Sequence, residues 1–374
     1  MHSRAPRTRR SLPFIAALCA AAPALAFADR VAGSSDDAAQ PPPAAQAEKK
    51  EEARGKGGFD FDAALEVVYT SNVFREQARR LDNFDSDGGQ GERFEGMEGP
   101  ADLYARPALE MAWSRQVASG RRLKLSAGAE LTAFARNSIA NYFTLEAAAS
   151  HDLTRHDRVG LEVELIPRRF KENYFNDVGG NKVFDQAVYT QVTPTVAYRR
   201  EWSKRWATEL EYELALRRFQ DPFAHRDTTT HTFLLLLARE LSDRATVKAG
   251  PELALAHVDN HVEFGADVNR SHRDLGVVGA LELNLRHGWA GEAELEYKHK
   301  SYSSDDPADD AHFERVDDAF DVDLEVEKRL TGAWYLTGLF GFTKVLSNRS
   351  DPSIDADEVG YTELVIGAGG AARF

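Results

Sequence analysis

The sequence predicts an all-β protein, an antiparallel up-and-down transmembrane β-barrel of about 14 strands with long extracellular loops and short periplasmic turns. Three observations predict this fold. Short junctions rich in Trp, Arg, Ser and Thr recur at intervals of 39 to 49 residues between Trp113 and the terminal Phe374. Each interval contains two runs of roughly 12–15 residues in which apolar and charged side chains alternate, which is the period of a strand with two unlike faces. A secretory leader precedes these hairpins, a combination typical of barrels of the outer membrane.

Residues 1–28 have the composition of a signal peptide. Four arginines precede an apolar stretch from Leu12 to Leu25, and Ala26-Phe27-Ala28 is a small-x-small cleavage site. Two prolines interrupt that stretch, whereas a membrane anchor needs about 18–20 unbroken apolar residues. The only cysteine, Cys19, lies in this segment, so we expect the mature chain to contain no disulfide and no lipid anchor.

Residues 29–57 are the expected periplasmic linker, because they contain almost no large apolar side chains and cannot bury enough surface to offset the entropy of ordering. The barrel is expected over residues 58–374.

The formal net charge is −14, and it falls to −18 without the leader, which has four basic and no acidic residues. This acidity excludes nucleic acid as an expected partner. The mean hydropathy of −0.46 is compatible with insertion of strands, which need only every second residue apolar.

The alternation assigns each strand an apolar face toward lipid and a charged face toward water. The apolar rows include Phe61, Ala63, Leu65, Val67 and Tyr69; Trp206, Thr208, Leu210, Tyr212, Leu214 and Leu216; and Trp289, Gly291, Ala293, Leu295 and Tyr297. A β-propeller has a similar repeat length, but its blades divide that length into four strands of about five or six residues. Here the alternation continues through 12 or more residues. The sequence therefore favours a barrel over a propeller or sandwich.

Loop lengths give the expected orientation. Short junctions follow every second strand, at residues 154–157, 203–205, 242–244 and 287–288, and are expected on the periplasmic side. Longer, acidic connections are expected outside, at residues 71–100, 175–184, 220–227, 259–270, 303–314 and 347–358, with a short one at 137–141. Two interfacial girdles of aromatic residues are expected, Trp113, Trp202, Trp206, Trp289 and Trp334 beside the short junctions and Tyr69, Phe134, Phe170, Phe219 and Tyr297 near the opposite ends.

Two motifs carry a resemblance to a known family. Ala371-Ala372-Arg373-Phe374 resembles the carboxy-terminal strand signature of outer-membrane proteins, and Tyr69-Thr70-Ser71-Asn72-Val73-Phe74-Arg75 resembles a stretch of porin-type outer-membrane β-barrels, some of them associated with exopolysaccharide export operons. The resemblance implies an integral, multi-pass barrel in the cell outer membrane. It also implies that Phe374 is an assembly signal for the barrel assembly machinery. Lipid and lipopolysaccharide are the expected surroundings.

The charged faces predict the residues that line a pore. Folding the chain symmetrically about the connection at residues 303–314 places Glu292 opposite Glu325, Glu294 opposite Asp323, Glu296 opposite Asp321 and Lys300 opposite Asp317. Like charges directly opposite each other destabilise a sheet, so these rows need water, cations or basic neighbours. The expected pore-lining residues are Glu209, Glu211, Glu213, Arg217, Glu292, Glu294, Glu296, Lys298, Lys300, Asp321, Asp323 and Glu325. We expect an acidic middle zone beneath a basic outer collar of Arg136, Arg168, Arg169, Arg217, Arg218, Lys298, Lys300 and Lys344. Interior ion pairing that closes a narrow lumen is the alternative.

Chemical motifs are sparse, and no cofactor is expected. The sequence contains no Gly-x-Ser-x-Gly, no His-Glu-x-x-His and no phosphate-binding glycine loop. Ser150, His151 and Asp152 are adjacent, but neighbouring strand residues face opposite ways and cannot form a triad. The acidic groups around Asp305–Asp310 and Asp351–Glu358 lack EF-hand spacing, so a solvated surface is favoured over a calcium site.

The leading hypothesis is therefore a porin-like barrel that passes small hydrophilic solutes or assists the export of a glycan. A structural or surface-binding barrel with a closed lumen is the second hypothesis, with the long loops contacting external partners. An outer-membrane hydrolase is the third, because paired carboxylates are present throughout the charged faces.

Overall fold

A computed structural model describes residues 57–74, 98–118, 121–178, 181–258, 262–263, 266–267, 269–307, 309, 312–348 and 360–374. The expected signal peptide and nearly all of the expected linker lie outside these residues. So do most of the connection at 71–100 and of the one at 347–358. No helix within the described ranges is long and apolar enough to cross a bilayer.

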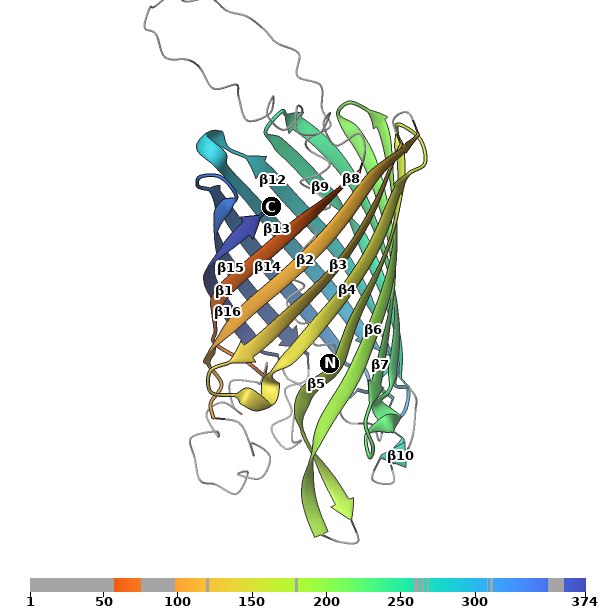
Figure 1. The fold of residues 1–374 in the computed structure, drawn as a ribbon. Helices are drawn as coiled ribbons and strands as arrows, with labels where there is room; N and C mark the ends of the chain where they lie inside the picture. Colours follow the sequence, from red (N-terminus) through yellow and green to blue (C-terminus); the bar gives the residue numbers. More distant parts are fainter. Residues whose placement is uncertain are drawn as a thin grey trace, which may run out of the picture.

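Fourteen strands of the described chain close into one antiparallel barrel, as the sequence predicts (Figure 1). Each strand pairs with its neighbours in chain order, and β1 pairs with β16. The barrel strands are β1 (Gly58–Thr70), β2 (Asp102–Ala118), β3 (Arg121–Phe134), β4 (Tyr142–Asp152), β5 (Asp157–Val178), β6 (Asn181–Ser203), β7 (Trp206–Phe219), β8 (Thr228–Ser242), β9 (Ala245–Val258), β12 (His272–Asn284), β13 (Trp289–Tyr302), β14 (Val316–Arg329), β15 (Trp334–Ser347) and β16 (Thr362–Arg373).

Short elements occupy several connections. The strands β10 (Val262–Glu263) and β11 (Ala266–Asp267) form a separate two-stranded sheet between β9 and β12. The 3-10 turns η2 (Ser138–Ala140) and η3 (Ala224–Arg226) lie at the end with the long connections, and η4 (Arg286–Gly288) forms a short turn between β12 and β13. The short junctions expected at 154–157, 203–205, 242–244 and 287–288 all connect neighbouring strands at one end of the barrel.

The seam between β1 and β16 is fastened at both ends. At the short-turn end, Phe374 and Phe61 exchange two backbone hydrogen bonds of 2.9 and 3.2 Å. At the opposite end, the Ser71 backbone N–H donates to the Leu364 carbonyl at 2.9 Å, and the Leu364 N–H donates to Ser71 Oγ at 2.8 Å. Asn72 Nδ2 donates to the Thr362 carbonyl at 3.4 Å. The Tyr69–Arg75 motif thus includes residues that close the barrel, while the assembly role of Phe374 remains a prediction.

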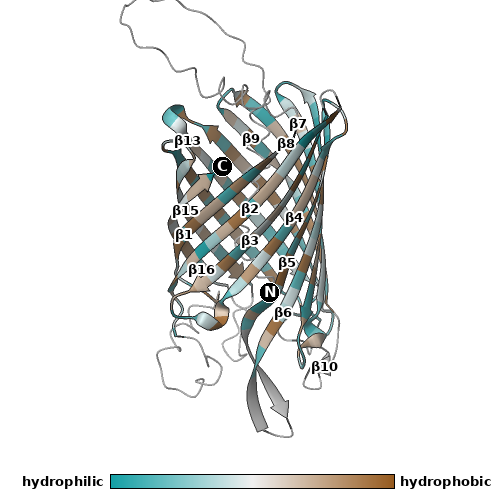
Figure 2. Ribbon diagram, in the orientation of Figure 1, coloured by the Kyte–Doolittle hydropathy of each residue, from teal (hydrophilic) through white to brown (hydrophobic). Residues whose placement is uncertain are grey.

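The two faces of each strand follow the predicted alternation. Leu65, Val67, Leu210 and Leu295 are 47–58% exposed on the outside, whereas Val68 and Glu66 on the inner face of β1 are buried. Figure 2 shows the mixture of apolar and polar positions along each strand. Four of the five tryptophans are exposed on the outer surface near the short turns, namely Trp202, Trp206, Trp289 and Trp334. This part of the predicted girdle is confirmed.

The second aromatic girdle is only partly confirmed. Tyr69 and Tyr297 are exposed on the outside. Phe170 instead is buried and packs with Val188, and the Phe134 ring lies 5.0 Å from that of the buried Tyr104. Phe219 likewise packs inside, against Phe223 and Ala187. The prediction was wrong for Phe134 and Phe219 because both occupy inward positions of their strands. It was wrong for Phe170 because Val188, Phe74 and Ile139 pack against that ring.

The connection expected at residues 175–184 is also different. Strands β5 and β6 continue through it, with Phe175 paired to Phe184 and Val178 to Asn181, and their hairpin projects beyond the rim in Figure 1. The pairing shifts register between Ile166 and Arg169 and again between Phe170 and Glu172. Pro167, which cannot donate to the ladder, lies at the first shift. The hairpin of β5 and β6 is therefore longer than the sequence predicts, with pairing that continues to Val178 and Asn181.

A pair of neighbouring substitutions on β13 tests the face assignment. Leu295→Arg, on the lipid face, should cost about 2–4 kcal/mol or prevent insertion. Glu294→Arg, one position away on the inner face, should fold. Urea unfolding in lipid vesicles, read by heat-modifiable gel migration, measures both. Equal folding of the two variants would contradict the assignment.

Small inward residues of β16 make room for neighbouring side chains at the seam. A Cβ on Gly369 would lie 2.5 Å from Glu66 Cγ and 2.6 Å from the Leu65 carbonyl oxygen. The second contact is with backbone and cannot rotate away. The glycine therefore lets the Glu66 side chain lie across β16.

Substitution of Gly369 should loosen the seam. Gly369→Val is expected to destabilise the barrel by about 1–3 kcal/mol through overpacking. Gly279→Val is the matched control, because a Cβ at Gly279 of β12 has no neighbour within 4 Å. Unfolding midpoints in urea measure both. The same loss in both variants would attribute the effect to glycine removal in general and contradict the packing argument.

Candidate functional site: the barrel lumen

The predicted register of β13 and β14 is confirmed. Glu292 pairs with Glu325, Glu294 with Asp323, Glu296 with Asp321 and Lys300 with Asp317. These side chains lie on the inner face, because the alternating residues Leu295, Tyr297, Phe320 and Leu324 are exposed outside. Three consecutive carboxylate pairs therefore face the interior from one wall. Asp321 also accepts a hydrogen bond from Thr343 Oγ1 of β15 at 2.7 Å.

The strand β7 carries the second acidic row, and its neighbours partly neutralise it. Glu209 forms an ion pair with Arg199 of β6, and its other oxygen lies 3.4 Å from Lys248 Nζ of β9. Lys248 also contacts Glu282 of β12 at 2.8 Å. Glu211 and Glu213 follow Glu209 along the same inner face. Lys248 is buried, so these contacts replace its hydration.

The basic collar differs from the prediction. Lys298 contacts Glu252 of β9 at 3.2 Å and Glu296 at 2.5 Å, so it belongs to the acidic zone. Arg217 stacks on the ring of Tyr189 at 4.6 Å and donates to Gln191 at 3.0 Å. Lys300 lies between Asp274 and Asp317 on neighbouring strands.

Two expected collar residues do not belong to the lumen. Arg218 and Lys344 are exposed at outward positions, opposite Thr190 and the outward-facing Phe320. Lys298 and Lys300 are thus interleaved with carboxylates on the inner face, whereas Arg218 and Lys344 lie on the outer face.

Small residues of β12 lie between charged side chains of its two neighbouring strands, β9 and β13. Gly276 of β12 is paired with both Lys298 and Glu252, so their side chains meet over a residue without a Cβ. A Cβ there would lie 3.2 Å from Lys298 Cγ. Ala280 is likewise paired with both Lys248 and Glu294. This arrangement permits charged side chains two strands apart to contact each other.

A buried ion pair joins β1 and β2. Arg106 lies directly opposite Glu66, and its Nε donates to Glu66 Oε2 at 2.7 Å, with Nη2 contacting the same oxygen. Both side chains are buried. The pair lies beside the seam, over Gly369.

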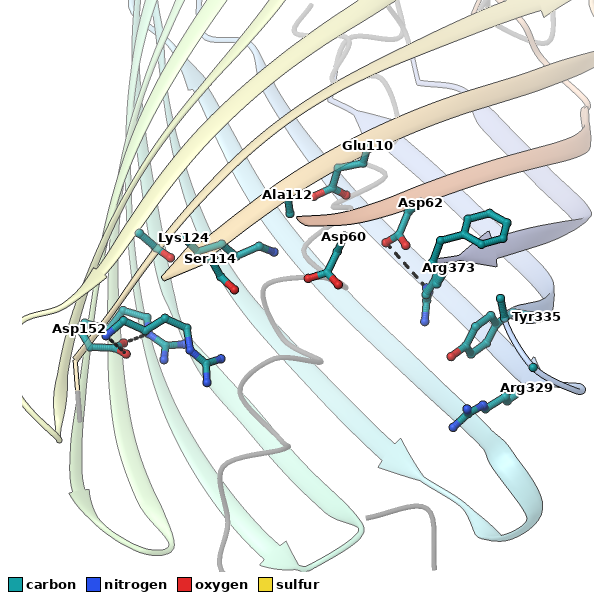
Figure 3. A pocket seen from close by; sticks show the side chains of 16 residues that line it. Asp60, Asp62, Glu110, Ala112, Ser114, Lys124, Asp152, Arg329, Tyr335 and Arg373 are labelled. Carbon is teal, nitrogen blue, oxygen red and sulfur yellow. Dashed lines mark hydrogen bonds and ion pairs between the residues drawn. The ribbon is translucent and has the colours of Figure 1, made fainter. Parts of the chain in front are cut away.

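A cavity of about 400 Å³ opens inside the barrel at the short-turn end (Figure 3). Its wall mixes charges: Figure 3 shows Asp60, Asp62 and Glu110 between Lys124 on one side and Arg373 with Arg329 on the other. Arg373 is held by Glu327 at 2.6 Å. Ser150 and Asp152 line this cavity while His151 bonds to the Arg122 carbonyl on the other side of β4, which confirms that the three adjacent residues do not converge.

A second cavity of about 160 Å³ lies along the other half of the wall. The two cavities share Arg158, whose Nε contacts Asp152 at 2.5 Å. Together their lining residues come from all fourteen barrel strands. Part of the lining of the second cavity is apolar and consists of Leu234, Leu236 and Val278. Leu234 and Leu236 belong to the apolar run at 233–238 that makes this part of β8 apolar on both faces, and Val278 belongs to β12.

At the opposite end, the connection between β13 and β14 packs into the mouth. Arg315 donates to both oxygens of Asp317, at 2.9 and 2.8 Å, and lies 4.7 Å from the centre of the Tyr302 ring. His312 bonds to Asp309 at 2.8 Å. Burial alone would raise the pKa of Asp309, but the bonds from His312 and the Asn269 backbone N–H hold that pKa below its usual value.

The connection between β13 and β14 contains one of the two acidic groups for which the sequence favours a solvated surface over a calcium site. Within the described residues, no three acidic, histidine or cysteine side chains come together in a way that could hold a metal ion. Asp310 and the group at residues 351–358 lie outside the described part of the chain. Asp309 is engaged in the contacts given above.

Sequence reasoning missed several inward-facing residues that shape the lumen. The carboxylates are Glu66, Glu110, Glu130, Glu146, Glu162, Glu164, Glu252, Asp274, Glu282 and Glu327, and the basic residues are Arg106, Lys124, Arg158, Arg199, Lys248 and Arg373. The alternation could have identified them, because each lies an even number of positions from other inward-facing residues of its own strand. Acidic residues still outnumber basic ones on the inner wall.

Comparison with family models and with curated proteins gave no match. Solved structures similar to this chain include a bacterial polysaccharide outer membrane secretin, at 12% identity over 83% of this chain and 98% of that chain, with a TM-score of 0.42. The outer membrane channel DcaP of Acinetobacter baumannii has 11% identity over 85% of this chain and 98% of that chain, with a TM-score of 0.43. An anion-selective porin from Comamonas acidovorans has 11% identity over 85% and 99%, with a TM-score of 0.39. Likenesses this distant assign no solute to this chain. Its closed 14-stranded barrel agrees with the porin-type resemblance at the level of the fold.

A double-mutant cycle tests the pair beside the seam. Arg106→Met should destabilise the barrel by about 3–5 kcal/mol, because it leaves the Glu66 carboxylate buried without its partner. The double variant Arg106→Met with Glu66→Leu should recover most of that loss. Urea unfolding in vesicles measures each corner of the cycle. Additive losses would show that the two side chains stabilise the barrel independently.

Proposed function

We propose that this chain is a porin-like channel of the outer membrane that passes small hydrophilic solutes and prefers cations. The observation that carries the proposal is the inner wall, where charged side chains from every part of the barrel surround cavities that together contact all fourteen strands. A lipid-facing exterior around a charged interior suits the transfer of water-soluble molecules.

Charge supports the preference for cations. The pairs of β13 and β14 present six carboxylates on adjacent strands. Between Glu292 and Lys300 on β13, and between Asp317 and Glu325 on β14, the only basic residues of the inner rows are Lys298 and Lys300. Ion pairs such as Arg199 with Glu209 reduce the excess without removing it. Because screening limits each charge to about 8–10 Å at physiological salt, a cation passing this wall meets mainly the nearby carboxylates.

Three other functions are alternatives to this proposal. A closed structural barrel is favoured by the interleaved ion pairs and by the buried Leu234, Leu236 and Val278 on the inner wall. Assistance with glycan export rests on the resemblance of the Tyr69–Arg75 motif. An outer-membrane hydrolase has the weakest support, because the adjacent Ser150, His151 and Asp152 face different sides of the sheet.

Conductance across a planar bilayer under a potassium chloride gradient tests the proposal. The reversal potential should report potassium preferred over chloride, and Glu294→Gln with Asp323→Asn should move the permeability ratio toward one. Asp243→Asn with Asp305→Asn removes the same charge outside the lumen and should leave the ratio unchanged. Anion selectivity would overturn the charge map, and folded protein without conductance would favour the closed barrel.

A further inference from the structure

Four outward-facing side chains form a patch at the short-turn end of the barrel. They are Arg200 and Trp202 of β6, Trp206 of β7 and Arg239 of β8, and all four are exposed. The three strands are neighbours in the wall, and Trp206 is paired directly with Arg239. We refer to these residues as the β6–β8 patch.

The patch is ordered by its own contacts. The guanidinium carbon of Arg200 lies 4.5 Å from the centre of the Trp202 ring, and that of Arg239 lies 5.0 Å from the Trp206 ring. Trp202 Nε1 donates to Thr208 Oγ1 at 2.8 Å, which fixes the orientation of the indole. Each arginine thus lies over the face of an aromatic ring, in a cation–π contact that restricts where its guanidinium can lie.

The patch carries positive charge that the protein itself offsets little. Arg200 Nη1 lies 3.6 Å from Asp157, while no carboxylate of the described chain is within ion-pairing distance of Arg239. The adjoining turns add three basic residues, Lys204, Arg205 and Arg244, and one carboxylate, Asp243. The surface therefore favours an anion.

The surroundings of the patch indicate which anion. Leu210, Leu235 and Leu237 are exposed on the same outer face and continue the surface from the patch toward the middle of the barrel. Tryptophan at such a position lies at the level of lipid headgroups. A ligand that fits both parts has an anionic head for the arginines and acyl chains for the leucines.

We propose that the β6–β8 patch binds the headgroup phosphate of an anionic phospholipid, such as phosphatidylglycerol, in the leaflet that surrounds the short-turn end. The arginines donate to the phosphate oxygens, the tryptophans hold the arginines at the interface, and the acyl chains lie on the leucines. The same pairing of ring and cation recurs once more around this end, where Lys328 Nζ lies 5.1 Å from the centre of the Trp289 ring. The site is independent of whether the lumen conducts.

Native mass spectrometry of the folded, detergent-solubilised full chain tests the proposal. Phosphatidylglycerol should be retained in preference to phosphatidylethanolamine, and Arg200→Gln with Arg239→Gln should weaken that retention by about fivefold, as expected for the loss of two exposed charge-assisted contacts. Arg218→Gln with Lys344→Gln is the matched control, because it removes two exposed, outward-facing cations at the opposite end. Heat-modifiable migration confirms that both variants fold.

Each outcome decides the matter. Preference for phosphatidylglycerol that is lost in the patch variant and kept in the control supports the site. Equal retention of the two lipids by the unaltered protein overturns it, as does equal loss in the patch and control variants. Displacement of the lipid by inorganic phosphate would show a simple anion site and overturn the assignment to a phospholipid.

Discussion

Every backbone amide in the part of this chain that faces hydrocarbon needs a hydrogen-bond partner, because no water is present there to supply one. Pairing of consecutive strands satisfies all but the two edges, so the whole arrangement depends on the meeting of β1 with β16. Backbone hydrogen bonds hold both ends of this seam, where pairing would otherwise fray. Phe374 bonds to Phe61 at one end, and Ser71 bonds to Leu364 at the other. Glycines on the inner face of β16 let the neighbouring side chains cover the seam from inside.

Closure of the barrel also brings charged side chains together in the interior, and ion pairs between strands reduce the repulsion among them. A strand that alternates faces must direct every second residue inward, and acidic residues exceed basic ones in this chain, with 60 Asp and Glu against 46 Lys and Arg. Basic residues such as Lys248 and Lys298 each serve two carboxylates on different strands, which lowers the repulsion with few cations. The remaining acidic excess on the inner wall is the basis of the proposed preference for cations.

Periodicity alone was sufficient to predict the fold, the faces and one register. The pairing of Glu294 with Asp323 followed from symmetry about a connection whose centre could be located in the sequence. The partner of Glu66 did not, because a long connection of unknown geometry separates it from Arg106. Contacts between strands two apart, such as Lys298 with Glu252, depend on barrel curvature and on a small residue between them, here Gly276, and neither is visible in the alternation. The same limit explains why Phe134 and Phe219 were placed outside, since an aromatic residue near a strand end serves a lipid interface and an apolar plug equally well.

The long hairpin of β5 and β6 leaves the wall beyond Leu165 and Tyr189, the last residues paired with β4 and β7. Two register shifts lie just past this point, one of them at Pro167, and they interrupt the continuous ladder that stiffens a sheet. Because the ladder is interrupted at these shifts, the projecting part of the β5–β6 hairpin, here called the arm, can bend without bending the barrel wall. Pulling on the tip would bend the arm at the shifts before it strained the wall, so contacts made by the arm outside the membrane would leave the dimensions of the lumen unchanged.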